Sequence, residues 1–431
     1  MTTTKEIANV VECPNCRVEV NIDELILGLD KLTRDLQRSG DLLTDQEARY
    51  LVDTYYEIQK YRVALGNQMK AIAKAHEPSI FFVWINKQVH ILEANIRAVL
   101  NTYSKKSDRG KWLHSNVGIG PVLAAALLAH IDITRAPTVS HIYSFAGLDP
   151  MAKWWKKDDA EPIVNRVIRG RRHLNETDAT EVALALGKKP ENFLLLLENL
   201  RGTRLSITQH DLVRAATWRP WNETLKTCCW KVGESFVKFQ NHKDDQYGRI
   251  YRIRKAHDWV LNLKGEYADQ AAISLQTKDY GRDTEAYAWY SGMVTVQAAR
   301  DYLQALALYQ KGQPVPKVAR VAAGAGQPML PPARIQRRAA RYAVKVFLGH
   351  YHHVAYEDHY GYAPARPYPI DQLHHGTYYH PANWPLGSQE PSATTAEWEE
   401  AIWPAALRGE ELLWTMADTP DEHEEDESEP V

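Results

Sequence analysis

The stretch VGIGPVLAAALLAHI, residues 117–131, decides the fold expected for this chain. Gly118 and Gly120 have no side chains, so the backbone can turn sharply there and another molecule can approach it closely. Pro121 suits the first turn of a helix, and the apolar residues after it continue that helix. The stretch therefore predicts a helix, a two-glycine hairpin and a second helix.

Such a hairpin can bind a nucleic-acid backbone without reading its sequence. The N–H groups in the first turn of the second helix have no partner within the helix and carry the positive end of its dipole, which suits a phosphate. We therefore predict nucleic-acid contacts at Gly118, Ile119 and Gly120. A purely structural hairpin has the same pattern, and that alternative stays open.

A second motif, FAGLDP at residues 145–150, follows the first. Together the two motifs resemble the C-terminal domain of the insertion-sequence transposases known as bridge-RNA recombinases. Three further stretches resemble parts of that domain, at residues 219–226, 246–251 and 338–362. The resemblance runs from about residue 45 to about 365 and is interrupted at roughly 156–218 and 265–332. It implies an origin in a mobile element or a bacteriophage.

The resemblance also implies catalytic parts that we do not find in this sequence. Family members hold magnesium with four acidic residues of an RNase H-like (RuvC-like) N-terminal domain and attack DNA with a serine of the C-terminal domain. Here the residues before the hairpin have no alternating strand pattern for such a domain. The family's serine follows the second motif, where this chain reads MAKWWKK at 151–157, and the next serine is Ser206. We therefore assign no catalytic residue.

The rest of the chain predicts an all-α, mainly helical protein. Thr44 and Glu47 form a capping box at the start of a long helix, and a second long helix follows Pro78, so the two form a coiled-coil-like hairpin. Further along, Trp230, Val232, Phe236 and Phe239 are expected core residues of a helix. The expected segments are an N-terminal arm (1–20), a helical hairpin (21–108), a transposase-like domain (109–365), a Pro- and aromatic-rich wrap with a short helix (366–408) and an acidic disordered tail (409–431).

Two groups of arginines are candidate nucleic-acid contacts. The first group lies in the first interruption, before a helix–turn–helix-like pattern at 177–200, and the second recurs at i, i+3, i+4 and i+7 on one helix face. Arginines on one face repel each other unless a polyanion neutralises them, and no acidic partner is evident nearby. The groups are Arg166, Arg169, Arg171 and Arg172, and Arg334, Arg337, Arg338 and Arg341. A solvated charged face and a stabilising helical pair are the alternatives.

Net charge hides an asymmetry along the 431 residues. The formal net charge is −2, but ten acidic residues and no Lys or Arg follow Arg408. The first 408 residues therefore carry 52 basic against 44 acidic side chains, a net +8. A basic body suits a nucleic-acid binder, and the tail either competes for the basic surface or simply aids solubility.

Metal sites are weakly indicated. Cys13 and Cys16 have zinc-knuckle spacing but make only half a site, so two more ligands would have to come from elsewhere, such as the partner of a dimer. His353 and Glu357 lie one helical turn apart in a segment rich in His and Tyr, without a recognisable metal motif. Cys228 and Cys229 are expected core residues.

We therefore expect a DNA-binding protein, derived from a transposase, that does not cut DNA by itself. Its expected partners are DNA or structured RNA and further copies of the chain, with no cofactor apart from the possible zinc. No signal region or membrane-spanning run is evident, which favours the cytoplasm of a bacterial or phage-infected cell. An active transposase or recombinase completed by a partner, and a structural protein of a mobile element or phage, remain alternatives.

Overall fold

The computed structural model describes residues 10–12, 19–21, 34–149, 154–171, 173–309, 313–366 and 380–386. Helices dominate these ranges, which confirms the predicted all-α fold class. The strands described are β1 (Val10–Glu12) and β2 (Glu19–Asn21), which pair antiparallel. No helix in these ranges is long and apolar enough to cross a bilayer.

The chain divides into two compact units, which we describe separately. The larger unit comprises residues 1–134 and 230–431, and the smaller unit comprises residues 135–229. The helix α12 (Glu223–Phe239) begins in the smaller unit and continues in the larger one.

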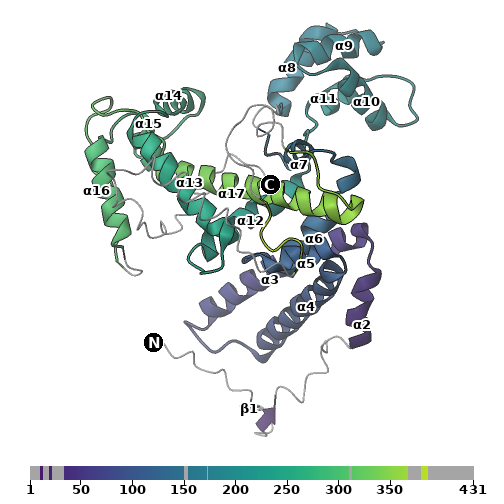
Figure 1. Cartoon of the computed structure of the whole chain (residues 1–431). Helices are drawn as coiled ribbons and strands as arrows, with labels where there is room; N and C mark the ends of the chain where they lie inside the picture. Colours follow the sequence, from purple (N-terminus) through teal and green to yellow (C-terminus); the bar gives the residue numbers. More distant parts are fainter. Residues whose placement is uncertain are drawn as a thin grey trace. The chain divides into compact units, whose positions relative to one another are not determined.

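Two long helices of the larger unit, α3 (Asp45–Ile72) and α4 (Ile80–Lys105), form the predicted antiparallel hairpin (Figure 1). The predicted capping box is present, because the Thr44 side chain accepts the Glu47 N–H and Glu47 accepts the Thr44 N–H. Between the two helices the buried Glu93 carboxylate binds Arg62. The short helix α2 (Arg34–Arg38) and the 3-10 turn η1 (Ser39–Leu42) precede the hairpin.

The core of the larger unit lies between helices that are far apart in sequence. The α3–α4 hairpin packs on α6, and α13 runs beside α17 (Figure 1). Phe236 stacks on Tyr247, and Phe347 packs edge-on against both. The other helices here are α5 (Asp108–Ser115), α6 (Pro121–His130), α13 (Gln246–Leu263), α14 (Ala268–Thr277), α15 (Glu285–Tyr290), α16 (Val296–Ala307) and α17 (Pro332–Tyr360).

Two of the four core residues expected in α12 are not buried. Val232 and Phe236 are fully buried, as predicted, whereas Trp230 is 60% exposed and Phe239 is 46% exposed. The apolar spacing of this helix therefore predicted its buried face only in part. The predicted burial of Cys228 and Cys229 is confirmed.

The 3-10 turn η2 (Ile133–Arg135) spans the boundary between the units, and the smaller unit continues with α7 (Val139–Phe145) and a group of four helices. These are α8 (Lys157–Ile168), α9 (Glu176–Ala185), α10 (Pro190–Arg201) and α11 (Gln209–Ala216). Each packs on its neighbours around a shared apolar core that includes Val164, Val182, Phe193 and Leu212 (Figure 1). The helix–turn–helix pattern predicted at 177–200 corresponds to α9 and α10.

Candidate nucleic-acid interface

At the predicted helix, two-glycine hairpin and second helix, the structure has α5, a five-residue turn and α6. The Ser107 hydroxyl caps the start of α5. In the turn, the Asn116 side chain donates to the Trp112 carbonyl at 2.6 Å, and the Ile119 N–H donates to the Asn116 carbonyl at 3.1 Å. These bonds within a few residues of each other explain why the sequence predicted this element.

The start of α6 is exposed at Gly120. Gly120 is the N-cap of the helix, and no side-chain hydrogen bond within the described part of the chain caps α6. A Cβ added at Gly120 would meet no atom of the described residues within 4 Å. Since α6 begins at Pro121, the N–H groups of Val122 and Leu123 have no carbonyl one turn earlier in the helix. This end of α6 therefore offers N–H donors and the positive end of a helix dipole.

Gly118 has a packing role that the sequence did not predict. Its φ is +88°, and a Cβ there would lie 2.9 Å from Ser235 Oγ and 3.4 Å from Phe239 Cδ2. The Ser235 hydroxyl donates to the Gly118 carbonyl at 2.6 Å. The close approach at Gly118 is therefore made by α12 of the same unit. Ile119 is buried, with 4% exposed, so Gly120 is the predicted hairpin residue that faces solvent.

The second motif, FAGLDP, packs within the smaller unit. The Phe145 carbonyl accepts the Asn222 N–H at 2.8 Å, and Asn222 Oδ1 accepts the Leu225 N–H at 2.8 Å, which caps α12. Gly147 has φ +65°, and a Cβ there would lie 2.9 Å from Trp221 Cγ. The motif thus joins the 219–226 stretch that the resemblance had singled out, while Pro150 lies outside the described residues.

Comparison with known families supports this interpretation of the two motifs. Residues 110–154, 45 of the 431, match the family described as Transposase IS116/IS110/IS902. The segment is related to the IS110-type transposases. No curated protein and no solved structure matches the chain. The matched segment covers the α5–α6 hairpin and the FAGLDP motif, so we call residues 110–154 the IS110-type segment below.

Trp154, the last residue of the IS110-type segment, and the next residue, Trp155, are both packed. Trp154 Nε1 donates to the Thr217 carbonyl at 3.0 Å, and its ring lies under the Arg219 guanidinium at 4.6 Å. Trp155 Nε1 donates to the Leu186 carbonyl at 3.0 Å, and the side chain packs on the α8–α11 core. Trp155 therefore fills part of the α8–α11 core, and Trp154 packs against Arg219 in the same unit.

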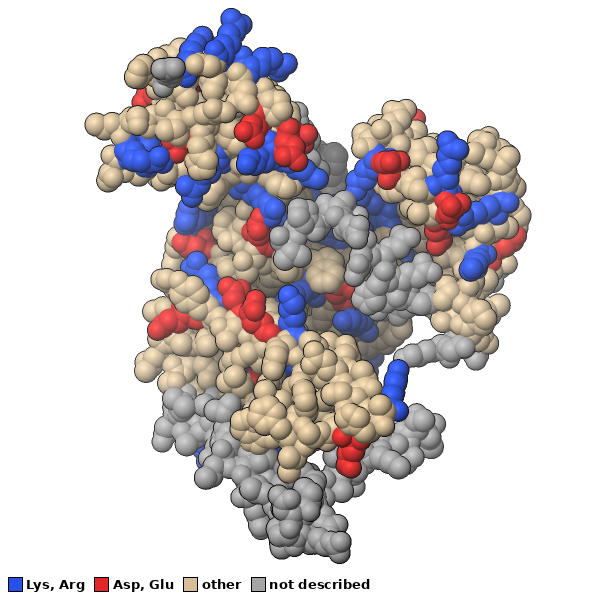
Figure 2. Space-filling view, turned by 180° about the vertical axis from the view of Figure 1, so that it is seen from behind, with Lys and Arg blue, Asp and Glu red and all other residues tan. Residues whose placement is uncertain are grey.

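The first arginine group lies where α8 ends. Arg166 and Arg169 are exposed, and Arg169 ends the helix with φ +48°. Arg171 is ion-paired with the buried Asp178 and lies 3.7 Å from Glu181. The Asn175 N–H and then Arg171 hold the pKa of the Asp178 carboxyl below its ordinary value. Figure 2 shows several Lys and Arg side chains together at the upper end of the α8–α11 group of helices. Arg172 lies outside the described residues.

The second arginine group lies on α17, and the expected lack of acidic partners is wrong for Arg338. Its guanidinium lies 3.5 Å from the buried Asp258 carboxylate and 4.5 Å from the centre of the Tyr267 ring. Burial alone would raise the pKa of Asp258, but His257, Arg254, Tyr267 and Arg338 together lower it. Arg334 is half-buried, and Arg337 and Arg341 are exposed on the same helix. Arg338 therefore neutralises a carboxylate of this protein.

The candidate metal ligands do not form a site in the part of the chain that the structure describes. No group of three or more His, Cys, Asp or Glu side chains there could hold an ion. His353 Nε2 lies 3.4 Å from Glu357 Oε2, which also accepts a hydrogen bond from Trp384 Nε1 at 2.9 Å. Cys13 and Cys16 lie outside the described residues.

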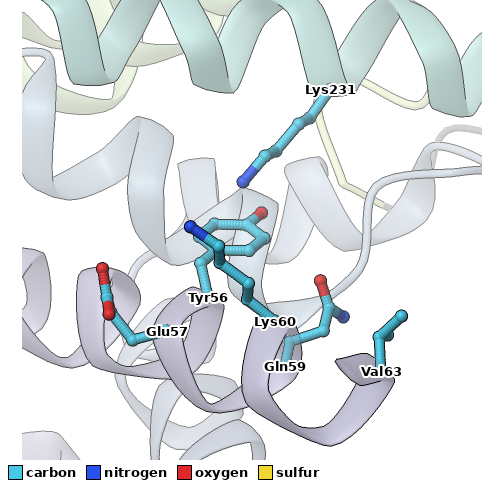
Figure 3. A pocket seen from close by; sticks show the side chains of 6 residues that line it. All are labelled: Tyr56, Glu57, Gln59, Lys60, Val63 and Lys231. Carbon is cyan, nitrogen blue, oxygen red and sulfur yellow. The ribbon is translucent and has the colours of Figure 1, made fainter. Parts of the chain in front are cut away.

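A shallow hollow lies between α3 and α12 in the larger unit. Figure 3 shows Lys231 reaching from α12 toward Tyr56, and its Nζ lies 2.8 Å from the centre of the ring. The hollow encloses about 420 Å³ and is lined by Tyr56, Glu57, Gln59, Lys60, Val63 and Lys231. The contact is a cation–π interaction that joins the two helices, and the lining includes no nucleophile–base pair.

Proposed function

We propose that this chain binds nucleic acid, and DNA in the first instance, as a protein derived from an IS110-type transposase. The observation that carries the proposal is the start of α6, where Gly120 is exposed and the first-turn N–H groups have no side-chain cap. It lies within the IS110-type segment. A phosphate placed there would accept hydrogen bonds from the backbone and lie at the positive end of the helix dipole.

The charge distribution favours the same proposal. The first 408 residues have a net charge of +8, and the exposed Arg166 and Arg169 add cations without an acidic residue between them. Contacts to phosphates release counterions from the nucleic acid, so affinity should fall steeply with salt. Contacts to the backbone alone give little sequence preference.

The test is a binding series with the purified chain at several salt concentrations. Labelled duplex DNA, single-stranded DNA and a structured RNA are each titrated at about 50–200 mM salt, the range over which several phosphate contacts change affinity by orders of magnitude. We expect the logarithm of the affinity to fall linearly with the logarithm of salt. No binding to any of the three at the lowest salt would refute the proposal.

We further propose that the chain does not cleave DNA by itself. After the FAGLDP motif, where the related enzymes place a nucleophile, Trp154 and Trp155 occupy packed positions. Metal-assisted phosphoryl transfer needs carboxylates to hold the ion and a group to orient the attacking oxygen. The test is incubation with supercoiled plasmid in magnesium or manganese. Nicking that disappears on mutation of a residue of this chain would refute this proposal.

The family match favours one second candidate, an active recombinase completed by a partner that supplies the acidic residues. Plasmid nicking that appears only when such a partner is added would support it. The binding surface proposed above serves either candidate, so the salt series does not decide between them.

A further inference from the structure

The helices α8–α11 are two copies of one two-helix unit. The first helices of the copies, α8 and α10, each have 12 residues and begin 33 residues apart, at 157 and 190. The second helices, α9 and α11, also begin 33 residues apart, at 176 and 209. An equal offset for both helices and for the loop between them indicates an internal duplication.

Buried residues follow the same offset. Five apolar positions that are buried in the first copy are also buried in the second, and both sets belong to one core. The equivalent pairs are Ala160 and Phe193, Val164 and Leu197, Ala179 and Leu212, Val182 and Ala215, and Ala183 and Ala216. The two copies therefore bury the same helix faces against each other.

The loops of the two copies share one polar arrangement. In each copy a loop arginine is ion-paired with a buried aspartate of the following helix: Arg171 with Asp178, and Arg204 with Asp211 at 2.7 Å. Each aspartate also completes a capping box at the start of its helix. The side chains of Arg171 and Arg204 stay about half exposed, at 46% and 52%.

A backbone pairing fixes the relation between the loops. Leu174 and Ile207 form an isolated antiparallel bridge, and they are equivalent residues of the two copies. When a residue pairs antiparallel with its own equivalent, a local two-fold axis passes between them. The loops that the structure describes at 169–171 and 202–206 therefore flank this axis, and Arg171 and Arg204 take two-fold-related positions.

We infer that these paired loops bind the two strands of a nucleic-acid duplex, an inference that rests on the proposed function. A duplex has local two-fold axes perpendicular to its length that relate its two backbones, so a two-fold surface can contact both in the same way. The loop residues that the structure describes include three arginines, Arg169, Arg171 and Arg204, and no acidic residue. Each of the two ion-paired guanidinium groups has N–H donors that do not contact its aspartate and that can donate to a phosphate oxygen. A single strand would engage one loop.

The duplication supplies matched substitutions in which one copy takes the other's residue. Arg169→Gly copies Gly202, which also has positive φ, so it removes a cation and relieves backbone strain. Leu205→Arg copies Arg172 at a position where the side chain is 93% exposed, so it adds a cation without burying it. Lys157→Gln is the control, because it removes one exposed charge from the opposite end of α8.

The full-length variants are titrated with a labelled duplex and with its single strand. We expect Arg169→Gly to weaken duplex binding by about threefold to tenfold and to lower the salt slope by about one unit, and Leu205→Arg to strengthen duplex binding by a similar factor. Lys157→Gln should change little, and the single strand should respond less than the duplex to every variant. Thermal unfolding of each variant checks that the fold is kept.

Two sets of results would overturn the inference while leaving nucleic-acid binding intact. In the first, wild type binds duplex with steep salt dependence, but Arg169→Gly and Leu205→Arg leave its affinity unchanged. In the second, Lys157→Gln weakens binding as much as Arg169→Gly does, or the single strand loses as much affinity as the duplex. Failure of wild type to bind any nucleic acid would refute the proposed function and the inference together.

Discussion

Gly118 and Gly120 lie two residues apart in one turn, and valine should affect the protein differently at each. At Gly118, where φ is +88°, backbone strain on a side chain costs about 1–3 kcal/mol. The new side chain would also displace the Ser235 hydroxyl, and its hydrogen bond to the Gly118 carbonyl contributes about 1 kcal/mol. We therefore expect Gly118→Val to lower the free energy of unfolding by about 2–4 kcal/mol.

At Gly120 the backbone tolerates a side chain. Its φ and ψ are −86° and 176°, which valine adopts readily, and no atom of the residues that the structure describes lies within 4 Å of the added Cβ. Replacing an N-cap glycine by an aliphatic residue costs about 0.5–1 kcal/mol. The added methyl groups would cover the N–H groups at the start of α6, and losing one hydrogen bond to a phosphate, about 1.5 kcal/mol, weakens binding roughly tenfold.

The assay pairs two measurements on both variants. Guanidinium denaturation followed by tryptophan fluorescence gives the free energy of unfolding, and fluorescence anisotropy with a labelled duplex gives the affinity. Gly118→Val should lose stability first, and Gly120→Val should lose affinity with its stability nearly kept. Wild-type affinity in Gly120→Val would refute phosphate binding at α6, and wild-type stability in Gly118→Val would refute the packing role of Gly118.

Three further predictions follow from the structure. Arg338→Gln should lower the free energy of unfolding by about 1–3 kcal/mol, because it removes one of the cations around the buried Asp258, while duplex affinity stays unchanged; a loss of affinity without a loss of stability would restore Arg338 to the binding surface. Deleting residues 409–431, which carry ten acidic side chains and no Lys or Arg, should tighten duplex binding if the tail covers the basic surface, and unchanged affinity would leave it a solubilising tail. Burial raises the pKa of Asp245 from 3.8 to about 6, so the folded state keeps a proton between about pH 4 and 6 that the unfolded state releases, and stability falls as pH rises through that window. Asp245→Asn keeps an acceptor for the Gly248 N–H and should flatten the dependence of Tm on pH there; an unchanged slope would assign the titration to another group.

The elements that the sequence predicted correctly are stabilised by neighbours in sequence. The capping box joins Thr44 to a residue three positions away, and the turn before α6 is closed by Asn116 and Ile119. All residues that form such a cap or turn lie within a few positions of one another in the sequence. Residue patterns and propensities are therefore enough to predict these elements.

The contacts that the sequence did not predict join residues far apart in sequence. Gly118 and Ser235 are separated by 117 positions. The residues around Gly118 in the sequence therefore do not indicate whether a phosphate or α12 approaches this glycine closely. The pairing of Arg338 with Asp258 likewise joins α17 to α13. A search for acidic partners on one helix face could not find a carboxylate on another helix.

The duplication combines features of both cases. Its repeated residues can be seen in the sequence, but the boundaries of the repeat differ from those of the expected helix–turn–helix. The predicted helix–turn–helix at 177–200 takes the second helix of one copy and the first helix of the next. The turn between them is internal to the fold, since Lys188 donates to the Ala215 and Ala216 carbonyls at the end of α11. The recurring signal is instead Arg-x-x-(Leu/Ile)-(Asn/Thr)-x-x-Asp, at 171–178 and 204–211. When the segment is divided into the two copies at these positions, the exposed arginines lie in two equivalent loops. A search for a single helix–turn–helix assigns these loops to different elements and misses their equivalence.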